Sequence, residues 1–534
     1  MDMYNKQFYD EQCKRYGTPR VLDDIVSLRA ADSPSAKILA FPFPRAESKC
    51  NEYYETFTAA QLKGFIDVAV QRFMAMGYKP SLGRAVGLLG ITNVDYLVTM
   101  LALSRLGYTV VLLSLRLKPA AVASLLKITQ ADTVIHDSSA TAVTTANLTS
   151  EIMALSVIPM LSRPDYDAPV DTAVVTQFFT AEELAPVSAI VFHTSGSTGM
   201  PKAIHFKHKS LASTIYTSGL PLNAVVSRPL YHGWGHVCLW STLYYGKVCY
   251  LLDTSQELTA DGLVEAVEAS DAQFIPAVPN NLELLAKSQR GLACLKAAKF
   301  VTTGGAPIRT SLGDYLVEQG VNFSNTLGCS EAVSSFGTSM FRPRDDPDWN
   351  FIEFHPLVRD HILLDPVSGD IHELVLLATF PGLARSNTNQ PITGSYRTGD
   401  MMRPHPNKPR AWVFLNREGD FIALATGEKV LGLPIEDRVR ESPLLDDVFV
   451  VGNGKPIPSL LVVPSPNVAK EDVLEQIWPF IEMANKNVDQ FSEIKKDKVY
   501  VLPASTQLPR TDKGNVIRPQ LYTQFAKEID SLYV

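Results

Sequence analysis

The sequence lacks several features that would place it in common classes of protein. Its six cysteines include no Cys-x-x-Cys pair, so the spacing typical of zinc or iron–sulfur sites is missing. Acidic residues outnumber basic ones by 56 to 49, and the formal net charge of −7 argues against a surface that attracts nucleic acid or anionic lipid. We therefore expect buried free thiols, no nucleic-acid partner and no membrane partner.

Long apolar runs are also missing. The most apolar region, residues 86–115, is interrupted by Asn93, Asp95 and Arg105, which argues against a membrane span. The first residues, Met-Asp-Met-Tyr-Asn-Lys-Gln, contain no apolar core of the kind found in signal peptides. A cytoplasmic protein is the expectation that follows.

A large folded core is indicated by 46% hydrophobic and 20% charged residues. Short segments rich in strand-forming residues alternate with segments that carry apolar residues at helical spacing. Strands are predicted at 86–90, 109–113, 133–136, 188–193, 248–252, 274–278 and 300–303. Helices are predicted at 58–76, 95–106, 119–128, 261–268 and 281–288. This alternation predicts an α/β protein with parallel sheets and crossover helices.

The pattern changes toward the carboxyl end of the chain. From about residue 356 the segments become shorter and alternate in polarity, which predicts a small β-rich subdomain. Strands at 448–451 and 460–463 and a helix at 471–484 predict a further α+β domain. We expect a large amino-terminal body at 1–416 and a small, mobile carboxyl-terminal domain at 417–534.

One loop is rich in glycine and hydroxyl side chains. It reads Thr-Ser-Gly-Ser-Thr-Gly-Met-Pro-Lys from Thr194 to Lys202, directly after a predicted buried strand. Glycines let backbone N–H groups turn toward a phosphate, the hydroxyls add donors, and Lys202 adds a positive charge. The loop differs from the usual P-loop because two residues separate its second glycine from the lysine. It suits a polyphosphate, although a loop of this composition by itself is also typical of a linker.

Four further stretches follow this loop in order. They are Pro-Leu-Tyr-His-Gly-Trp-Gly-His at 229–236, Leu-Gly-Cys-Ser-Glu at 327–331, Tyr-Arg-Thr-Gly-Asp at 396–400, and a polar turn around Lys513. Together the five resemble the adenylate-forming superfamily, which contains acyl-CoA synthetases, luciferases and the adenylation domains of nonribosomal peptide synthetases. The stretch from Arg417 to Val430 and the Leu-Ser-x-Arg-Leu form at 113–117 look most similar to adenylation domains of fungal synthetase-like aryl carboxylic acid reductases.

The resemblance implies an ATP-dependent ligase that converts a carboxylic acid to acyl-AMP, releases pyrophosphate, and passes the acyl group to a thiol. Such a site must neutralise phosphate charge and hold the reactants in line, because a carboxylate is a poor nucleophile that ATP repels. By resemblance, Glu331 holds Mg²⁺ and the catalytic residues are Lys513, His232 and Glu331. Asp400 is expected to accept hydrogen bonds from the ribose, and residues 304–306 to line the adenine slot.

The resemblance assigns two sets of contact residues. Those expected to bind the nucleotide are Thr194, Ser195, Gly196, Ser197, Thr198, Gly199, Lys202, Gly304, Gly305, Ala306, Leu327, Ser330, Asp400 and Arg417. Those expected to surround the acyl group are His232, Gly233, His236, Thr303, Thr326 and Ser334. Taken singly, most of these are ordinary surface carboxylates, packed histidines or turn glycines. The functional interpretation depends on their occurrence as an ordered set.

Several positions depart from the family pattern. Amino-acid-activating domains usually carry aspartate where His232 stands, and a buried ammonium group without a partner is costly, so a non-amino acid such as a hydroxylated benzoate is expected. Leu327 stands where an aromatic residue usually stacks on adenine. Gly419 occupies the usual hinge position. The usual catalytic lysine position holds Asn515, so its role is assigned to Lys513.

Three functional alternatives follow. In the first, the chain loads the phosphopantetheine thiol of a carrier domain, which acts in cis in a longer protein or in trans. In the second, it is a stand-alone acid–CoA ligase. In the third, it is a catalytically silent binding protein, which Leu327 and Asn515 favour and which the phosphate and ribose motifs disfavour.

Overall fold

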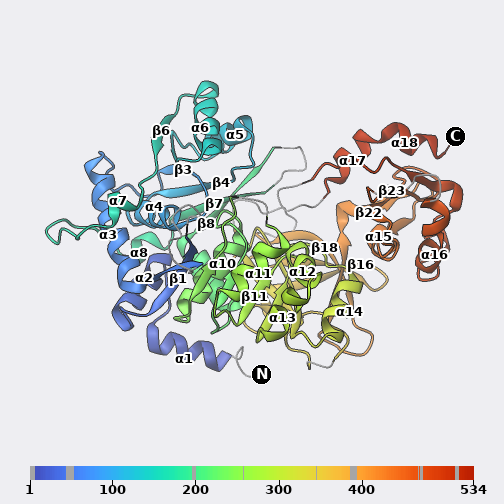
Figure 1. Cartoon of the computed structure of the whole chain (residues 1–534), viewed down its shortest axis with the longest axis horizontal. Coiled ribbons are helices and arrows are strands. Elements are labelled where there is room, and N and C mark those ends of the chain that lie inside the picture. Colours follow the sequence, from blue (N-terminus) through green and yellow to red (C-terminus); the bar gives the residue numbers. More distant parts are fainter. Residues whose placement is uncertain are drawn as a thin grey trace. The chain divides into compact units, whose positions relative to one another are not determined.

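The computed structural model describes residues 6–43, 53–194, 200–255, 258–343, 346–384, 394–466, 468, 473–510 and 516–533. The chain divides into two compact units (Figure 1). The large unit comprises Met1–Pro307, Leu316–Ile362 and Leu376–Tyr396. The carboxyl-terminal unit comprises Ile308–Tyr315, Leu363–Val375 and Arg397–Val534. The domain division between residues 416 and 417 stays a prediction.

A six-stranded sheet forms one layer of the large unit. Its order is β6 (Ser156–Pro159), β5 (Thr133–His136), β3 (Ala85–Leu89), β4 (Thr109–Leu113), β7 (Ser188–Thr194) and β8 (Lys202–Lys207). The first five strands pair in parallel, and β8 pairs antiparallel with β7. The sequence analysis did not predict β8. The strand forms because its interior buries Ala203, Ile204 and Phe206, while both end lysines stay exposed.

A nine-stranded sheet forms the second layer. Its order is β15 (Glu353–Phe354), β14 (Ser334–Thr338), β13 (Phe323–Cys329), β12 (Phe300–Thr303), β11 (Phe274–Ala277), β9 (Ala224–Val226), β10 (Cys249–Leu251), β1 (Lys37–Pro42) and β2 (Tyr54–Thr58). The central strands are parallel, and antiparallel strands flank them at both edges. The predicted α/β class is confirmed.

Helices surround both sheets. They are α1 (Lys6–Tyr16), α2 (Leu22–Asp32), α3 (Ala59–Ala75), α4 (Val94–Arg105), α5 (Pro119–Ile128), α6 (Ala140–Ile152), α7 (Arg163–Tyr166), α8 (Ala181–Leu184), α9 (His208–Ser218), α10 (Gly233–Tyr244), α11 (Ala260–Glu268), α12 (Pro279–Ala286), α13 (Gln289–Ala297) and η2 (Arg359–His361). Most of α14 (Thr310–Glu318) belongs to the carboxyl-terminal unit. Side-chain capping determines where helices such as α3 begin. The backbone of Gln61 donates to Thr58 Oγ1 at 3.2 Å and its side chain accepts from the Thr58 N–H at 2.9 Å, which fixes the start of α3.

The two faces of the six-stranded sheet pack against different hydrophobic cores. Leu88 and Leu112 lie in the main core, which also contains residues of α2, α3, α4, α9 and α10. Leu89 and Leu113 point the opposite way and pack with α5 and α6. This follows from the two-residue repeat of a strand. It explains why both strands read as unbroken apolar runs.

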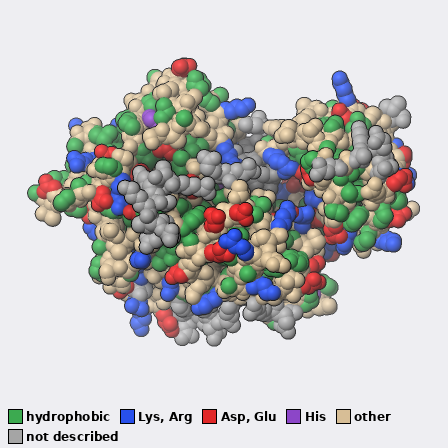
Figure 2. Space-filling model, viewed as in Figure 1, with side chains coloured by type: hydrophobic (Ala, Val, Ile, Leu, Met, Phe, Trp, Pro, Cys, Tyr) green, Lys and Arg blue, Asp and Glu red, His purple; other side chains and the backbone are tan. Residues whose placement is uncertain are grey.

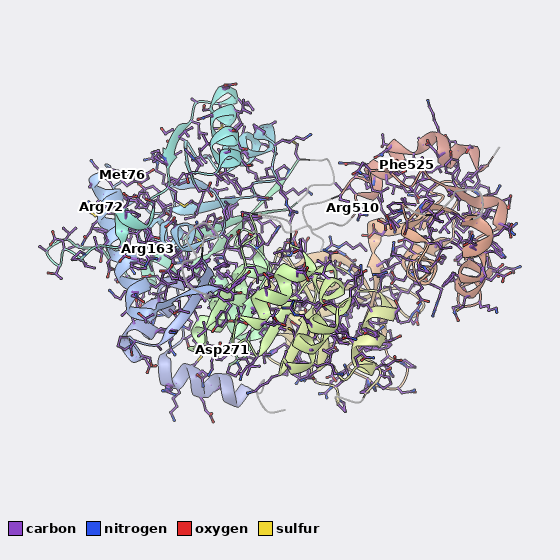
Figure 3. All side chains as sticks on the ribbon, in the orientation of Figure 1. Arg72, Met76, Arg163, Asp271, Arg510 and Phe525 are labelled. Atoms are coloured by element: carbon purple, nitrogen blue, oxygen red, sulfur yellow. The ribbon has the colours of Figure 1, made fainter. Side chains whose placement is uncertain are left out.

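The carboxyl-terminal unit is built from small sheets and short helices. Its elements are β16 (Ile362–Ser368), β17 (Ile371–Leu376), β18 (Tyr396–Pro404), β19 (Trp412–Arg417), η4 (Glu418–Asp420), β20 (Phe421–Ala423), β21 (Lys429–Leu431), α15 (Gly432–Val439), β22 (Leu445–Val451), β23 (Ser459–Pro464), α16 (Val473–Asn485), η6 (Gln490–Ser492), η7 (Lys496–Lys498), β24 (Val499–Val501), α17 (Arg518–Gln524) and α18 (Ala526–Ser531). Val448 and Val450 of β22 pack with α15 and α16. Phe449 and Val451 pack on the other face with Phe525 between α17 and α18, which Figure 3 labels.

Acidic and basic side chains are interspersed on the face of each unit that Figure 2 shows. Among the described residues, no helix is both long enough and apolar enough to cross a membrane.

Candidate nucleotide and acyl site

The β7–β8 hairpin carries both ends of the glycine- and hydroxyl-rich loop. Thr194 closes β7 and pairs directly with Lys202, which opens β8. Lys202 is exposed, so its ammonium group is accessible to a ligand. The expected phosphate-binding residues between them, Ser195, Gly196, Ser197, Thr198 and Gly199, lie outside the described residues. The structure therefore fixes where the loop begins and ends: both ends meet at one edge of the six-stranded sheet.

The amino-terminal turn of α10 carries three of the expected acyl-pocket residues. His232 is the N-cap of the helix and is half-buried, with its ring centroid 4.8 Å from that of Tyr231. Gly233 begins the helix, and His236 follows one turn later. The preceding backbone is anchored because the Leu230 N–H donates to Thr92 Oγ1 at 3.0 Å. These contacts fix the entry of the chain into α10 and so the place of His232.

His236 is completely buried, and burial lowers its pKa to about 3, so the imidazole is neutral at physiological pH. Its Nε2 accepts the Trp240 indole N–H at 3.0 Å. The proton must therefore sit on Nδ1, for which no partner is found among the described residues. Phe192 at the end of β7 packs edge-on against the ring, with centroids 5.2 Å apart. The arrangement leaves one unpaired donor in apolar surroundings.

The ends of β12 and β13 carry the expected adenine and acyl residues. The Thr326 hydroxyl donates to the Thr303 carbonyl at 2.7 Å, which ties the two strand ends together. A Cβ on Gly304 would lie 2.5 Å from Thr326 Oγ1 and 2.8 Å from its carbonyl oxygen, so only glycine fits there. The Thr303 hydroxyl is buried, and it has no partner among the described residues.

The remaining residues of this edge are more accessible. Gly305 is exposed, Ala306 is half-buried, and a Cβ on Gly305 would lie 3.8 Å from the Trp234 ring of α10. Leu327 is half-buried on β13. Gly304 is buried, so only Gly305 and Ala306 present accessible backbone here, and the adenine slot at 304–306 stays a prediction.

A turn at 330–333 joins β13 to β14 and carries Ser330 and Glu331. Both residues are half-buried, and the Glu331 carbonyl accepts the Ala384 N–H at 2.8 Å. Ser334 begins β14 directly after the turn. No cluster of three or more His, Cys, Asp or Glu side chains able to hold a metal occurs in the described parts of the chain. One carboxylate fits Mg²⁺ bound together with substrate phosphates, because Mg²⁺ takes one or two carboxylates and keeps phosphate or water oxygens as its other ligands.

Asp400 and Arg417 face each other in the carboxyl-terminal unit. They are register partners on β18 and β19, and Arg417 Nε donates to Asp400 Oδ1 at 2.9 Å. Asp400 is buried and Arg417 is exposed, so the pair offers an oriented carboxylate beside an accessible guanidinium. The two expected ribose-contacting residues thus lie together.

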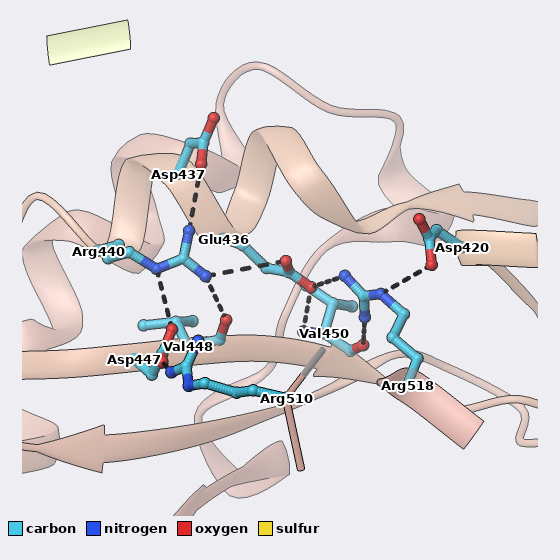
Figure 4. A network of polar contacts seen from close by, with 9 residues as sticks. All are labelled: Asp420, Glu436, Asp437, Arg440, Asp447, Val448, Val450, Arg510 and Arg518. Carbon is cyan, nitrogen blue, oxygen red and sulfur yellow. Dashed lines mark hydrogen bonds and ion pairs between the residues drawn. The ribbon is translucent and has the colours of Figure 1, made fainter. Parts of the chain in front are cut away.

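Gly419 lies in η4 and is exposed. Nothing lies within 4 Å of the position where its Cβ would be, which suits a pivot. The next residue, Asp420, pairs with Arg518 Nε at 3.3 Å. Arg518 also donates to Glu436 at 2.6 Å and to the Val450 carbonyl at 3.2 Å (Figure 4). The residue after the expected pivot is therefore bound to the core of its own unit.

Lys513 and Asn515 lie outside the described residues. The chain on either side is fixed, because Arg510 and Val516 form an antiparallel bridge. Arg510, which Figure 3 also labels, pairs with Asp447 of β22. The assignment of Lys513 as the catalytic lysine remains a prediction.

Two residues were missed by the sequence analysis. Trp240 fixes the tautomer of His236 from four residues further along α10, a helix that the sequence analysis did not predict. Val333 has a backbone φ of +43°, which no feature of the sequence indicates.

The fold is that of known acyl-CoA ligases. An anthranilate–CoA ligase solved with anthranoyl-AMP matches with a TM-score of 0.76 at 16% identity, over 96% of this chain and 98% of that one. ATP-bound MatB from Rhodopseudomonas palustris matches with a TM-score of 0.75 at 17% identity, over 96% and 100% of the two chains.

Residues 29–354 match the AMP-binding enzyme family, and residues 419–534 match the AMP-binding enzyme C-terminal domain. The chain therefore belongs to the AMP-binding enzyme family, and the predicted resemblance is confirmed.

Curated relatives include adenylate-forming reductase Nps11 of Serpula lacrymans, 30% identical over 64% of this chain and 33% of that protein. Another is the carboxylic acid reductase of Neurospora crassa, 25% identical over 98% of this chain and 51% of that protein. The chain thus spans between a third and a half of the length of these relatives.

Proposed function

We propose that the chain activates a non-amino, aromatic carboxylic acid with ATP and Mg²⁺. A carboxylate oxygen of the acid attacks the α-phosphorus of ATP, the bond to the bridging oxygen breaks, and pyrophosphate leaves with that electron pair. A phosphopantetheine thiol of a carrier domain then loses its proton and attacks the acyl carbon, the bond from that carbon to the AMP oxygen breaks, and AMP leaves as the thioester forms. Membership of the AMP-binding enzyme family supports this proposal.

The proposed roles follow the chemistry of each residue. Lys202 and the loop before it neutralise the β- and γ-phosphates, and Asp400 orients the ribose with Arg417 beside it. Lys513 bridges the carboxylate and the α-phosphate. Bound Mg²⁺, held by Glu331, supplies charge neutralisation at the phosphates. His232 at the start of α10 borders the acyl group.

The single observation that carries the acid class is the buried donor of His236. An unpaired buried N–H costs about 1–3 kcal/mol of free energy, and a ligand that accepts a hydrogen bond from His236 Nδ1 recovers that cost on binding. The neutral imidazole does not pair with an ammonium group, and the Thr303 hydroxyl likewise has no partner in the described part of the chain. These two polar atoms favour an acid with an uncharged acceptor, and a hydroxylated benzoate has one.

A screen of carboxylic acids by ATP–pyrophosphate exchange tests the proposal. Benzoates with a hydroxyl or carbonyl substituent are expected to support exchange, and α-amino acids are not. Exchange with amino acids alone would overturn the acid class, and no exchange with any acid would overturn the function. Lys513→Ala is expected to lose at least about a hundredfold in exchange, whereas full exchange would assign the lysine no role.

A stand-alone acid–CoA ligase is the second candidate. The fold match to an anthranilate–CoA ligase supports it, whereas relatives named as adenylate-forming reductases support the carrier-bound acceptor. Offering the preformed acyl-AMP complex either free CoA or a phosphopantetheinylated carrier domain distinguishes them, and we expect faster transfer to the carrier. A reaction that depends on ATP and free thiols also suits the cytoplasm, where we place the protein.

A further inference from the structure

The turn between β13 and β14 contains a strained residue. Val333 has a φ of +43°, in the left-handed region that β-branched side chains avoid because both γ-methyl groups crowd the backbone. In the described part of the chain, the other non-glycine residue with positive φ is Gln130, at +57°. Gln130 is exposed just beyond the end of α5, whereas Val333 is buried two residues after Glu331. The strain at Val333 therefore falls inside the candidate site.

Neighbouring segments hold the turn from two sides. On one side, the Ala384 N–H donates to the Glu331 carbonyl, and a Cβ on Gly382 would lie 2.9 Å from the Ala332 carbonyl oxygen. On the other side, Val333 packs on the first residue of α10. A Cβ on Gly233 would lie 3.2 Å from Val333 Cγ2 and 3.3 Å from Cγ1. The Val333 side chain thus occupies the space between the Glu331 turn and the start of α10.

This contact joins two parts of the candidate site that are far apart in the sequence. The turn carries Ser330 and Glu331, and the helix start carries His232 as its N-cap. The turn itself is closed by backbone bonds from Ala332 and Val333 to the Cys329 carbonyl, at 3.3 and 3.1 Å. A change in the size of either contacting residue must therefore shift the turn against the helix.

We propose that Val333 is a positioning residue, whose side chain packs on Gly233 and sets the place of Glu331 relative to His232. The strained backbone aims the side chain at α10, and the glycine at 233 leaves the space that it fills. The inference rests on the proposed function, because Glu331 and His232 are site residues under that proposal. It adds a residue pair that the motifs do not contain.

A double-mutant cycle tests the pair. Gly233→Ala is expected to lower kcat for pyrophosphate exchange about 30-fold with KM for ATP nearly unchanged, because the added methyl pushes the turn away. Val333→Ala is expected to lower kcat about tenfold. The double variant is expected to be no worse than Val333→Ala, since the smaller residue makes room for the methyl. If the fold-losses in kcat of the two single variants multiplied in the double variant, the proposal would be overturned, because the new methyl group would then clash with substrate and not with Val333.

Stability measurements test the strain, with Gln130 as a matched control. At a position with positive φ, glycine is more stable than alanine, the reverse of the order at ordinary positions. We expect a higher Tm for Val333→Gly than for Val333→Ala, and the same order for Gln130→Gly and Gln130→Ala. Both Val333 variants are expected to lose activity, while both Gln130 variants keep it. The opposite Tm order at Val333, or full activity of its variants, would overturn the proposal.

A second readout separates this inference from the proposed function. If the wild-type chain exchanged no pyrophosphate with any acid, the proposed function would fail. Calorimetry of ATP binding with and without Mg²⁺ then serves as the measurement in place of turnover. Val333→Ala is expected to reduce the gain in ATP affinity that Mg²⁺ provides about tenfold, and Gln130→Ala is expected to leave this gain unchanged. Equal affinity for both variants would reject Val333 as a positioning residue.

Discussion

Two sets of buried polar groups, one from each unit, are satisfied in different ways. In the large unit, His236 and Thr303 are buried among the expected acyl-pocket residues, and neither His236 Nδ1 nor the Thr303 hydroxyl has a partner among the described residues. In the carboxyl-terminal unit, Glu436 is equally buried, yet it accepts the Val450 N–H at 2.8 Å and a charged bond from Arg518 at 2.6 Å. An unpaired buried group gains a hydrogen bond when a ligand supplies the partner, whereas a paired buried charge stabilises the fold that surrounds it.

The charge network of the carboxyl-terminal unit extends beyond this pair. Arg440 donates to the Val448 carbonyl at 2.8 Å and pairs with Asp437 at 3.2 Å and with Asp447 at 3.4 Å (Figure 4). Burial opposes protonation of Arg518, but the carboxylates of Glu436 and Asp420 outweigh it and raise its pKa. The network therefore stays charged, and it connects β22, α15 and the residue after the expected pivot.

The largest expected effect breaks this network. Glu436→Ala leaves Arg518 without its closest partner in a buried position, and such a loss costs about 3–5 kcal/mol. His236→Phe removes an unpaired donor but also the acceptor of the buried Trp240 N–H, so it is expected to cost less, about 1–3 kcal/mol. Chemical denaturation of both full-length variants measures the difference. Equal losses would contradict the difference between the paired charge of Glu436 and the partly unpaired imidazole of His236.

His236→Phe is also expected to change substrate choice. Without the Nδ1 donor, the preference for a hydroxylated over an unsubstituted benzoate should fall about 10- to 100-fold in pyrophosphate exchange. His208→Phe is the matched control. That histidine is also buried, with a pKa lowered to about 4 and no ring-nitrogen partner in the described structure, but it lies on α9 outside the predicted pocket. A similar loss of preference in the control would remove His236 from the pocket.

Gly419→Pro tests the expected pivot. Proline holds φ near −65°, which suits the 3₁₀ turn at 418–420, so the unit should fold while rotation at this residue is restricted. Acyl transfer to the thiol is expected to fall about tenfold more than pyrophosphate exchange. Gly419→Ala is the control, because a Cβ there meets no neighbour within 4 Å. Equal losses in both half-reactions would argue against a pivot at this position.

Opposite responses to pH are the smallest expected effect. Burial lowers the pKa of His355 to about 4, and those of His208 and His236 to about 4 and 3, so the unfolded chain takes up these protons first as pH falls below 6.5. The large unit therefore loses stability on acidification. Burial raises the pKa of Asp437 to about 6, so the folded carboxyl-terminal unit takes up that proton first and gains stability.

Calorimetry of the full chain at about pH 7.5 and pH 5.5 measures these shifts. We expect the transition of the large unit to move down by several degrees and that of the carboxyl-terminal unit to move up. Glu436→Ala identifies the second transition, because it should lower that one alone. Transitions that move together would contradict the contrast between the units.

Much of the large unit could be predicted because its strands are short apolar runs separated by helical patterns. The bounds of β4, α5, β5 and β12 agree with the sequence prediction to the residue. β8 was missed because its end lysines and a central His205 obscure the alternation of buried residues. The strain at Val333 arises from packing against Gly233, and the Asp400–Arg417 pair from strand register. Such long-range contacts leave no local pattern in the sequence.

The carboxyl-terminal unit takes Ile308–Tyr315 and Leu363–Val375 from the middle of the chain as well as everything after Tyr396. Leu363–Val375 contributes most of β16 and β17, which form one sheet with β18 and β19, so this sheet can close soon after residue 417 leaves the ribosome. Ile308–Tyr315 is made earlier and waits for the rest of its unit. A fragment that stops at residue 416 would keep this sheet nearly whole, with β19 as an edge strand cut off from the elements that follow it, and aggregation of such a fragment would be a consequence of topology alone.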